Sequence, residues 1–514
     1  MASSQNPGDP TYRRSLGEGG LVLRWSTTED KAGCVLLSCL AVQEPEGQES
    51  ERAFRYFEPS MDDAFHAGSS TNWAVCVDTS PIQKSQTPTS SDSDSYVDKM
   101  RLVAQSAKER VVAIVYFLPA EFALDQDTVR LPVGYALIVA CKPAYRGASG
   151  GENIMDRLFE MVNARAHTAG CALMVTSGIP GYYRTQGYEY ALDMGRGLVT
   201  YLSPPNPNVP TNTPSSFALR PATLDDLPVL ERLVTAPRAG AEIFVGVRES
   251  ARPRQLRHLL GDRPPAYPSD THPTDPWFVL EKRDTPEAPP RVVAAAGLRT
   301  RKLGVRPTVP RVHPLLWDGV EDASAVAQAI TRELVREVET QLAANGSPDR
   351  PANIRWALPD AHPLYRWLLA HELAVPTPGS SRYDFMSAWW VSIPSLSTFL
   401  AALTPALNAR LAGSKHIFGS NYTATLHIAA SKTMGGGVVL RVADGTVSLA
   451  PVDAAKDGKP NLSLPRGPLL QLMVGYAGWR ELKALFPDVA VEPAVVPLVD
   501  VLFPKRNVWS GMYF

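Results

Sequence analysis

The sequence has few cysteines, and their spacing gives them no metal-binding or disulfide pattern. Its 514 residues contain five, at positions 34, 39, 76, 141 and 171, and none forms a Cys-x-x-Cys pair. An odd number without framework density favours a reducing environment, so we expect a cytoplasmic protein. The nine histidines show no His-Glu-x-x-His or similar spacing, so we expect no metal site.

Long apolar runs and an excess of charge of one sign are also lacking. No window approaches 18 uninterrupted apolar residues, so we expect no membrane span. The opening "MASSQNPGDPTYRRSLGEGG" has no apolar core, so we do not expect a secretory signal. A formal net charge of −1 without a long basic run argues against bulk binding to nucleic acid or anionic lipid, but not against a local basic groove.

What is present indicates a globular chain of several domains. Apolar residues make up 44% and charged residues 20%, which is typical of globular proteins, and the length predicts two to four domains. Residues 80–95, rich in Ser, Thr and Asp, predict a mobile surface insertion. Residues 203–216 predict the main interdomain linker, and 263–276 a long loop. A weaker boundary falls near Ala388.

A short pattern occurs on both sides of this linker. Leu-Arg-x-x-Thr-x-x-Asp stands at residues 23–30 and again at 219–226, and each copy predicts a strand end followed by a Thr-capped helix. Residues 180–189, "PGYYRTQGYE", have a looser counterpart in 363–372, "PLYRWLLAHE". Because the two pairs occur in the same order with similar separations, we interpret the chain as two copies of one α/β unit.

In the first copy, a small-residue turn joins an apolar strand to an amphipathic helix. The strand is predicted at 133–141, and the helix carries Ile154, Leu158, Met161 and Val162 on one face. The turn between them, "CKPAYRGASGG", could converge its backbone N–H groups on an anion, and Arg146 could add a charged contact. It lacks the Gly-Lys-Ser/Thr of a P-loop and the GxGxxG of a dinucleotide site. On the turn alone, an anion site and an ordinary strand-to-helix connection both remain open.

This strand, the turn, the helix, a buried strand at 171–177 and then Tyr-x-x-x-Gly-Tyr together resemble the GNAT family of acetyl-CoA-dependent N-acetyltransferases. The family motif Arg/Gln-x-x-Gly-x-Gly/Ala is here Arg146-Gly147-Ala148-Ser149-Gly150-Gly151. The resemblance implies that these six N–H groups bind the coenzyme A pyrophosphate. It also implies that the backbone of Val139 and Cys141 faces the pantetheine and the thioester. Ser149 stands where the family has its first glycine, so we expect weakened rather than lost binding. Cys141 would be a buried structural thiol.

A wider resemblance is to the Eis (enhanced intracellular survival) type of these enzymes. It implies an α/β (α+β) chain with a catalytic GNAT domain at 1–202, a degenerate GNAT-like domain at 217–388 and a sterol-carrier-like α+β domain at 389–514. It also implies a homo-oligomer. The equivalent turn of the second unit lacks the Arg-x-x-Gly-x-Gly motif, and Asp318, Glu321 and Asp322 there would repel a pyrophosphate. In the last region we expect a sheet over 424–451 and one helix over 468–482.

The resemblance also implies the catalytic groups. Tyr183, four residues before Gly187, would be the general acid, because a tyrosine with a pKa of about 10 is protonated at neutral pH. Without the motif, it would be interpreted as a core aromatic residue. Enzymes of the Eis type use the chain's own terminal carboxylate as the base, which here belongs to Phe514 in "VWSGMYF". The alternative is a docked C-terminus that seals a core without chemistry.

The function predicted from these observations is transfer of an acetyl group from acetyl-CoA to the primary amine of a small molecule. Two alternatives stay open. The sterol-carrier-like region is also consistent with a lipid- or apolar-ligand-binding protein, or with a pseudoenzyme. The same catalytic groups would also suit a protein-lysine acetyltransferase.

Overall fold

The computed structural model describes the chain in segments. They are residues 6–17, 19–41, 73–81, 96–124, 129–146, 153–178, 181–193, 197–202, 216–235, 243–246, 260, 276–299, 310–317, 319, 321–344, 353–358, 362–376, 388–419, 421–453, 458–506 and 508–509. The expected insertion (80–95), linker (203–216) and long loop (263–276) lie almost entirely outside these segments.

The largest sheet is built mainly from the N-terminal part of the chain. Its main path runs β1-β2-β3-β4-β5-β6-β16-β7, and β10 and β22 join it beside β4. The strands are β1 (Arg13–Leu16), β2 (Leu21–Trp25), β3 (Trp73–Asp78), β4 (Arg110–Leu124), β5 (Val129–Cys141), β6 (Leu173–Thr176), β7 (Glu189–Asp193), β10 (Ile243–Gly246), β16 (Ala388–Ser392) and β22 (Val508–Trp509).

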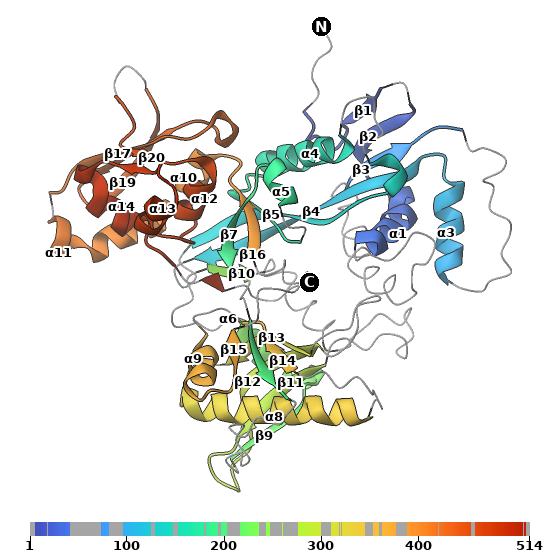
Figure 1. Ribbon diagram of the computed structural model, residues 1–514, viewed down its shortest axis with the longest axis vertical. Helices are drawn as coiled ribbons and strands as arrows, with labels where there is room; N and C mark the ends of the chain where they lie inside the picture. The colour runs from blue at the N-terminus through green and yellow to red at the C-terminus, as the bar shows by residue number, and fades with distance from the viewer. Residues whose placement is uncertain are drawn as a thin grey trace.

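Helices cover both faces of this sheet (Figure 1). On one face lies α4 (Ile154–Thr168), which buries Ile154, Leu158, Met161 and Val162 as its 3.6-residue spacing predicts. The other face is covered near the N-terminus by α1 (Lys31–Ala41) and α3 (Tyr96–Ser106), and farther along by the C-terminal region. β4 and β5 form one long hairpin that pairs from Ala113↔Cys141 to Leu124↔Val129. β5 is therefore longer than the strand predicted at 133–141.

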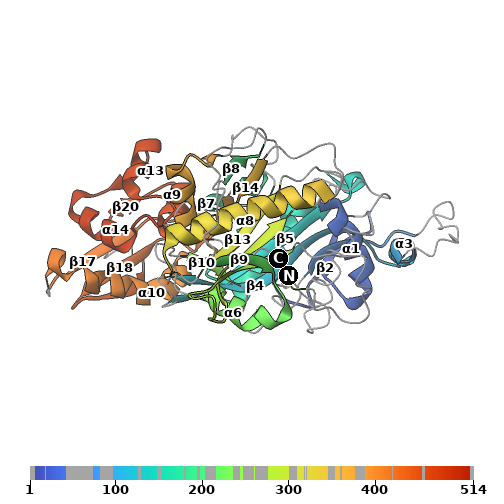
Figure 2. The same cartoon turned by 90° about the horizontal axis from the view of Figure 1, so that it is seen from below.

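A second sheet follows the order β15-β8-β14-β13-β12-β11-β9. The long helix α8 (Ala323–Ala344) crosses it, as Figure 2 shows. The strands are β8 (Leu198–Tyr201), β9 (Phe217–Pro221), β11 (Trp277–Lys282), β12 (Arg291–Arg299), β13 (Arg311–Trp317), β14 (Asn353–Trp356) and β15 (Val375–Pro376), with α6 (Leu227–Thr235) and α9 (Pro363–Ala370) as further helices.

The two sheets exchange strands. β8 directly follows the first sheet in the sequence but lies between β14 and β15 of the second. Conversely, β16 follows the second sheet in the sequence but lies between β6 and β7 of the first. Each sheet is therefore completed by a strand from the other side of the expected domain boundary.

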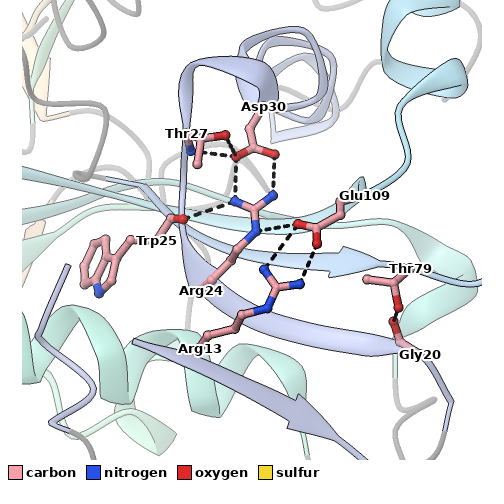
Figure 3. A network of polar contacts seen from close by, with 8 residues as sticks. All are labelled: Arg13, Gly20, Arg24, Trp25, Thr27, Asp30, Thr79 and Glu109. Atoms are coloured by element: carbon pink, nitrogen blue, oxygen red, sulfur yellow. Dashed lines mark hydrogen bonds and ion pairs between the residues drawn. The ribbon is translucent and has the colours of Figure 1, made fainter. Parts of the chain in front are cut away.

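The repeated sequence pattern forms the same local structure twice. In the first copy, Arg24 donates two hydrogen bonds to Asp30, at 2.7 and 2.9 Å, and a third to Glu109 at 2.7 Å (Figure 3). Asp30 also accepts from the backbone N–H of Thr27 at 2.7 Å, which closes the N-cap of the turn η1 (Thr28–Asp30).

In the second copy, Arg220 makes the equivalent contacts with Asp226, at 2.7 and 2.8 Å, and with Glu281 at 2.8 Å. The capped turn here is η5 (Leu224–Asp226). The predicted strand-and-cap structure is thus present in both copies.

The C-terminal region is α+β. Its sheet has the order β19-β18-β17-β20-β21. The predicted helix over 468–482 is wrong in one respect: it is two helices, because the chain turns at Gly475 with φ +77°. The elements are β17 (Ala424–Ile428), β18 (Val438–Ala443), β19 (Thr446–Pro451), β20 (Leu462–Ser463), β21 (Ala490–Val491), α10 (Leu396–Gly413), α11 (Lys415–Phe418), α12 (Arg466–Met473), α13 (Trp479–Leu485) and α14 (Val496–Leu502).

The C-terminal region shares its core with the first sheet. One continuous apolar cluster runs from Phe122 and Val133 in that sheet to Phe399 in α10 and Leu498 in α14. Among the described residues, no helix is long and apolar enough to cross a membrane.

Candidate active site

The site begins where two parallel strands of the first sheet part. β5 pairs with β6 only from Val133↔Leu173 to Tyr135↔Val175. Beyond Tyr135, β5 continues to Cys141 with β4 as its partner. No other described strand pairs with that edge. The Ala136 and Cys141 carbonyls accept side-chain hydrogen bonds, and the backbone groups between them have no described strand as a partner, which is what an extended acyl-carrying arm would require.

A β-bulge shapes this free edge. Between the pairs Ile114↔Ala140 and Tyr116↔Leu137, β5 has one more residue than β4. Ile138 takes a φ of +47° there, a conformation that a β-branched residue rarely adopts. A bulge bends its strand and increases the local twist, so it accounts for the divergence of β5 from β6. Val139, named from the resemblance, is half-buried directly beyond it.

The turn after β5 is held by a polar network that the sequence did not reveal. The Tyr145 hydroxyl donates to the Asp78 carboxylate at 2.8 Å, and Arg110 does so from β4 at 2.8 Å. Burial acts to raise the pKa of Asp78, but hydrogen bonds from Ser80, Tyr145 and Arg110 outweigh it and lower the pKa to about 2. This permanent carboxylate fixes η4 (Pro143–Tyr145), which leads into the predicted cofactor loop.

Of the predicted loop, the structure describes Arg146 only. Its side chain is exposed, and its Nε donates to the Cys141 carbonyl at 3.2 Å. Gly147, Ala148, Ser149, Gly150 and Gly151 lie outside the described residues. Helix α4 starts just beyond them and is capped by Asn153, whose side chain accepts from the Met155 N–H at 3.0 Å. The positive end of its dipole is thus directed at the loop.

Cys141 is buried at the strand end, with 7% of its surface exposed. Burial raises the pKa of its thiol, and the nearby Arg146 only partly offsets this. At neutral pH the thiol is therefore protonated, which makes it a poor nucleophile.

Tyr183 lies beside the point where the strands part. It belongs to the single-turn helix α5 (Tyr182–Thr185), and only 3% of its surface is exposed. Burial raises the pKa of its hydroxyl, and a hydrogen bond with Thr176 acts in the opposite direction. Thr176 ends β6, and its own hydroxyl donates to the Ala136 carbonyl of β5 at 2.7 Å. Tyr183 is thus a protonated phenol linked to the split between the strands.

The wall around Tyr183 includes an aromatic residue from a distant part of the chain. Trp390 of β16 lies with its ring centroid 5.9 Å from that of Tyr183 and stacks on Tyr190 at 3.6 Å. Arg184 places its guanidinium over Trp390 at 5.7 Å and pairs with Glu189 at 2.7 Å. Trp390 is far from Tyr183 in the sequence, so no local pattern indicated this contact.

The C-terminal region also contacts the α5–β7 turn. The Arg466 guanidinium lies against Gly187, where an added Cβ would come within 2.6 Å of it. Gln471 donates to the Tyr190 carbonyl at 2.7 Å. Helix α12 therefore supports the segment that carries Tyr183.

The equivalent place in the second sheet is occupied by the chain's own groups. The Tyr365 hydroxyl of α9 donates to the Trp356 carbonyl at 2.6 Å and accepts from the Leu358 N–H at 2.9 Å. At the start of α8, Glu321 pairs with Lys282 at 2.6 Å and also with Arg291. Asp322 accepts from the Ser324 N–H at 2.9 Å. Asp318 lies outside the described residues.

A crevice lies between the first sheet and the C-terminal region. It is lined by Phe122, Leu131 and Leu173 on one side and by residues including Phe399, Leu403 and Phe503 on the other. Its free volume of about 10 Å³ holds no more than one water molecule. Drug-sized ligands need several hundred Å³, so this crevice does not accommodate a sterol.

Two further predictions concern a metal site and the C-terminus. Within the segments described, no three His, Cys, Asp or Glu side chains gather where they could hold a metal ion. Phe514 lies outside the described residues, and the last residue described is Trp509 in β22. β22 pairs in parallel with β10, which pairs with the end of β4, so the chain approaches its C-terminus alongside the first sheet.

Comparison with known protein families identifies an acetyltransferase (GNAT) domain over residues 72–191. This range runs from β3 to β7 and contains the parted strands, the turn, α4 and Tyr183. The chain thus contains the domain of an acyltransferase, and domains of this kind use acetyl-CoA as the acyl donor. A comparison with curated proteins gives no match.

Several solved structures share the fold over nearly the whole chain. A GCN5-related N-acetyltransferase from Anabaena variabilis has a TM-score of 0.58 at 14% identity, covering 96% of this chain and 100% of that one. A GCN5-related N-acetyltransferase from Kribbella flavida has a TM-score of 0.57 at 16% identity, covering 96% and 98%. Eis1 from Mycobacterium abscessus has a TM-score of 0.54 at 12% identity, covering 96% and 100%. At these identities the likeness is one of fold.

Proposed function

We propose that the protein transfers the acetyl group of acetyl-CoA directly to the primary amine of a small molecule. The observation that carries this proposal is the buried, protonated hydroxyl of Tyr183 at the point where β5 and β6 part. The amine nitrogen attacks the thioester carbonyl carbon, the C–S bond breaks, and the nitrogen loses a proton to a base. The products are the N-acetyl amine and coenzyme A.

Tyr183 is the proposed general acid. As the C–S bond breaks, the leaving thiolate takes the phenolic proton, which solvent later restores. Because burial raises the pKa of Tyr183 above its usual value of about 10, the proton is present at neutral pH. It is lost only when the pH rises through that raised pKa. The rate should therefore show no decline due to this residue below about pH 10.

The terminal carboxylate of Phe514 is the proposed base, and the direction of β22 supports it. Trp509 pairs with Phe244 of β10, which in turn pairs with Ala123 of β4. A chain continuing in the same direction for the five residues 510–514 would run along β4 toward Leu118 over about 17 Å. Leu118 pairs with Tyr135, the last residue at which β5 still pairs with β6. β22 also contacts β7, so the sheet curls around this region.

The loop Arg146–Gly151 is the proposed pyrophosphate site. Its support is the capped start of α4 immediately after it and the Asp78 network immediately before it. The second unit is the proposed degenerate copy, because carboxylates already occupy the start of α8 and the Tyr365 hydroxyl is engaged by backbone. We further propose a cytoplasmic homo-oligomer, and the presence of all five cysteines as buried thiols suits a reducing compartment.

An amine panel tests the proposed function. The full-length protein is incubated with acetyl-CoA and each amine, and release of free thiol is followed together with the mass of the product. We expect at least one small primary amine to gain one acetyl group. If peptide lysines alone are acetylated, the small-molecule assignment is wrong; if coenzyme A binds but no amine reacts, the catalytic assignment is wrong.

The C-terminus offers a matched set of three variants for testing the base. Phe514→Ala keeps a carboxylate at the same position, whereas deleting Phe514 or adding one glycine after it moves that carboxylate. We expect Phe514→Ala to retain most of kcat, and the two length variants to lose about 100-fold. Equal activity in all three would remove the carboxylate from the mechanism.

A further inference from the structure

One buried hydroxyl beside the site has no hydrogen-bond partner in the described part of the chain. Tyr182 directly precedes Tyr183 in α5, and its Oη is sealed from solvent without a donor or an acceptor. The other hydroxyls of this turn are satisfied: Tyr188 donates to Asn163 at 3.2 Å, and Thr185 donates to the Tyr182 carbonyl at 2.7 Å. A buried polar group that lacks a partner destabilises the folded chain, so Tyr182 needs an explanation.

The surroundings of Tyr182 place it on the cofactor side of the site. Its ring meets that of Tyr183 edge-on, with centroids 5.3 Å apart. It also lies against Phe159 of α4, with ring centroids 6.5 Å apart, and its hydroxyl is close enough to Asp156 of α4 and Cys141 at the end of β5 for both to act on its pKa. The side chain thus lies between β5 and α4, the two elements that flank the predicted path of the co-substrate.

The hydroxyl of Tyr182 is a donor at neutral pH. Burial raises its pKa to about 12, with smaller contributions from Asp156, Tyr183 and Cys141. A phenol that keeps its proton can satisfy an acceptor oxygen. The bound molecule should therefore bring a carbonyl to this place.

We propose that Tyr182 donates a hydrogen bond to a carbonyl oxygen of the pantetheine arm of acyl-CoA. This inference rests on the proposed function, because it assumes that the Tyr183 hydroxyl meets the thioester sulfur. The ring of Tyr182, next to that of Tyr183, then lies beside the pantetheine arm rather than beside the nucleotide. The Tyr182 hydroxyl would thus gain its hydrogen-bond partner when the co-substrate binds.

The test compares Tyr182→Phe with Tyr188→Phe in the full-length protein by calorimetric titration. The ligands are coenzyme A and adenosine 3′,5′-bisphosphate, which lacks the pantetheine arm. For Tyr182→Phe we expect the Kd for coenzyme A to rise about tenfold and the Kd for the bisphosphate to stay unchanged. The melting temperature of the ligand-free variant should not fall, because an unpaired buried hydroxyl has been removed.

The control variant should behave in the opposite way. Tyr188→Phe removes a hydroxyl already bonded to Asn163, so its melting temperature should fall while its Kd for coenzyme A stays near that of the wild type. Equal affinity of Tyr182→Phe and wild type for coenzyme A would overturn the inference. So would an equal loss for coenzyme A and the bisphosphate, which would move the contact to the nucleotide. If the wild type bound no coenzyme A, the proposed function would fail instead.

Discussion

Asp78 joins the turn after β5 to the rest of the sheet. It accepts from the Tyr145 hydroxyl, the Arg110 guanidinium and the Ser80 N–H, each at 2.8 Å. These bonds keep the carboxylate ionised although only 7% of the residue is exposed. The turn that leads to Arg146 therefore has a fixed starting point before any cofactor binds.

The low pKa of Asp78 predicts a pH-dependent contribution to stability. Its folded pKa of about 2 lies below the usual value of 3.8, so the contribution is present above about pH 4 and is lost as the pH falls toward 2. Its size is about 2 kcal/mol. Asp78→Asn should melt at a lower temperature than the wild type at pH 7, and the gap should narrow in acid. Parallel pH profiles would show that Asp78 is not the group responsible.

Sequence patterns identified residues well where the physics is local. The spacing of Ile154, Leu158, Met161 and Val162 identified the buried face of α4, because helical periodicity depends on neighbours alone. The position of Tyr183 came from the Tyr-x-x-x-Gly-Tyr pattern, and its role as the general acid stays a prediction. The unsatisfied hydroxyl of Tyr182 is revealed only by the three-dimensional environment.

At the scale of elements, the divergence of β5 and β6 depends on a bulge that no sequence signal indicated. The extra residue lies at Ile138, where propensity predicts ordinary strand geometry. The single helix predicted over 468–482 was broken by Gly475, since helical periodicity alone does not show where a glycine turns the chain.

The contact between α12 and the α5–β7 turn predicts how two glycine substitutions affect stability and kcat. Gly187→Ala adds a Cβ within 2.6 Å of the Arg466 guanidinium, at a φ of +82°. Gly181→Ala is the matched control, because its φ is +75° but nothing lies within 4 Å of the new Cβ. Backbone strain should lower the free energy of unfolding of both variants by about 1 kcal/mol. The clash should lower that of Gly187→Ala further and should also reduce its kcat.

A double variant separates the clash from the backbone strain. Adding Arg466→Ala to Gly187→Ala should recover part of the lost kcat, because the obstructing guanidinium is gone. This recovery is measured from the melting temperatures and steady-state rates of the wild type, the two glycine variants and the double variant. If the two glycine variants are equally impaired, the contact with α12 does not position the Tyr183 turn.

The whole molecule is bound together by the exchange of β8 and β16. Strand pairs between residues hundreds of positions apart leave no local trace, so the linker composition at 203–216 suggested a simpler division than the sheets follow. The shared core of the first sheet and the C-terminal region has the same origin. The strand exchange and the shared core could not be predicted, because a single sequence contains no information on which strands pair.

Truncation tests this organisation. Residues 1–202 alone would lack β16, which lies between β6 and β7, and would expose the apolar face covered by α10 and α14. We expect this fragment to be insoluble or unfolded by circular dichroism. Co-expression of 1–209 with 210–514, cut within the linker, should restore a folded complex. A soluble 1–202 fragment that binds coenzyme A would contradict the exchange.

The proposed mechanism requires Tyr183 to supply the proton for the departing thiolate. The most direct measurement is kcat for Tyr183→Phe with saturating acetyl-CoA and an accepted amine, alongside the Kd for coenzyme A. We expect kcat to fall about 100-fold or more and the Kd to change by less than about threefold. A variant with the kcat of the wild type would contradict it.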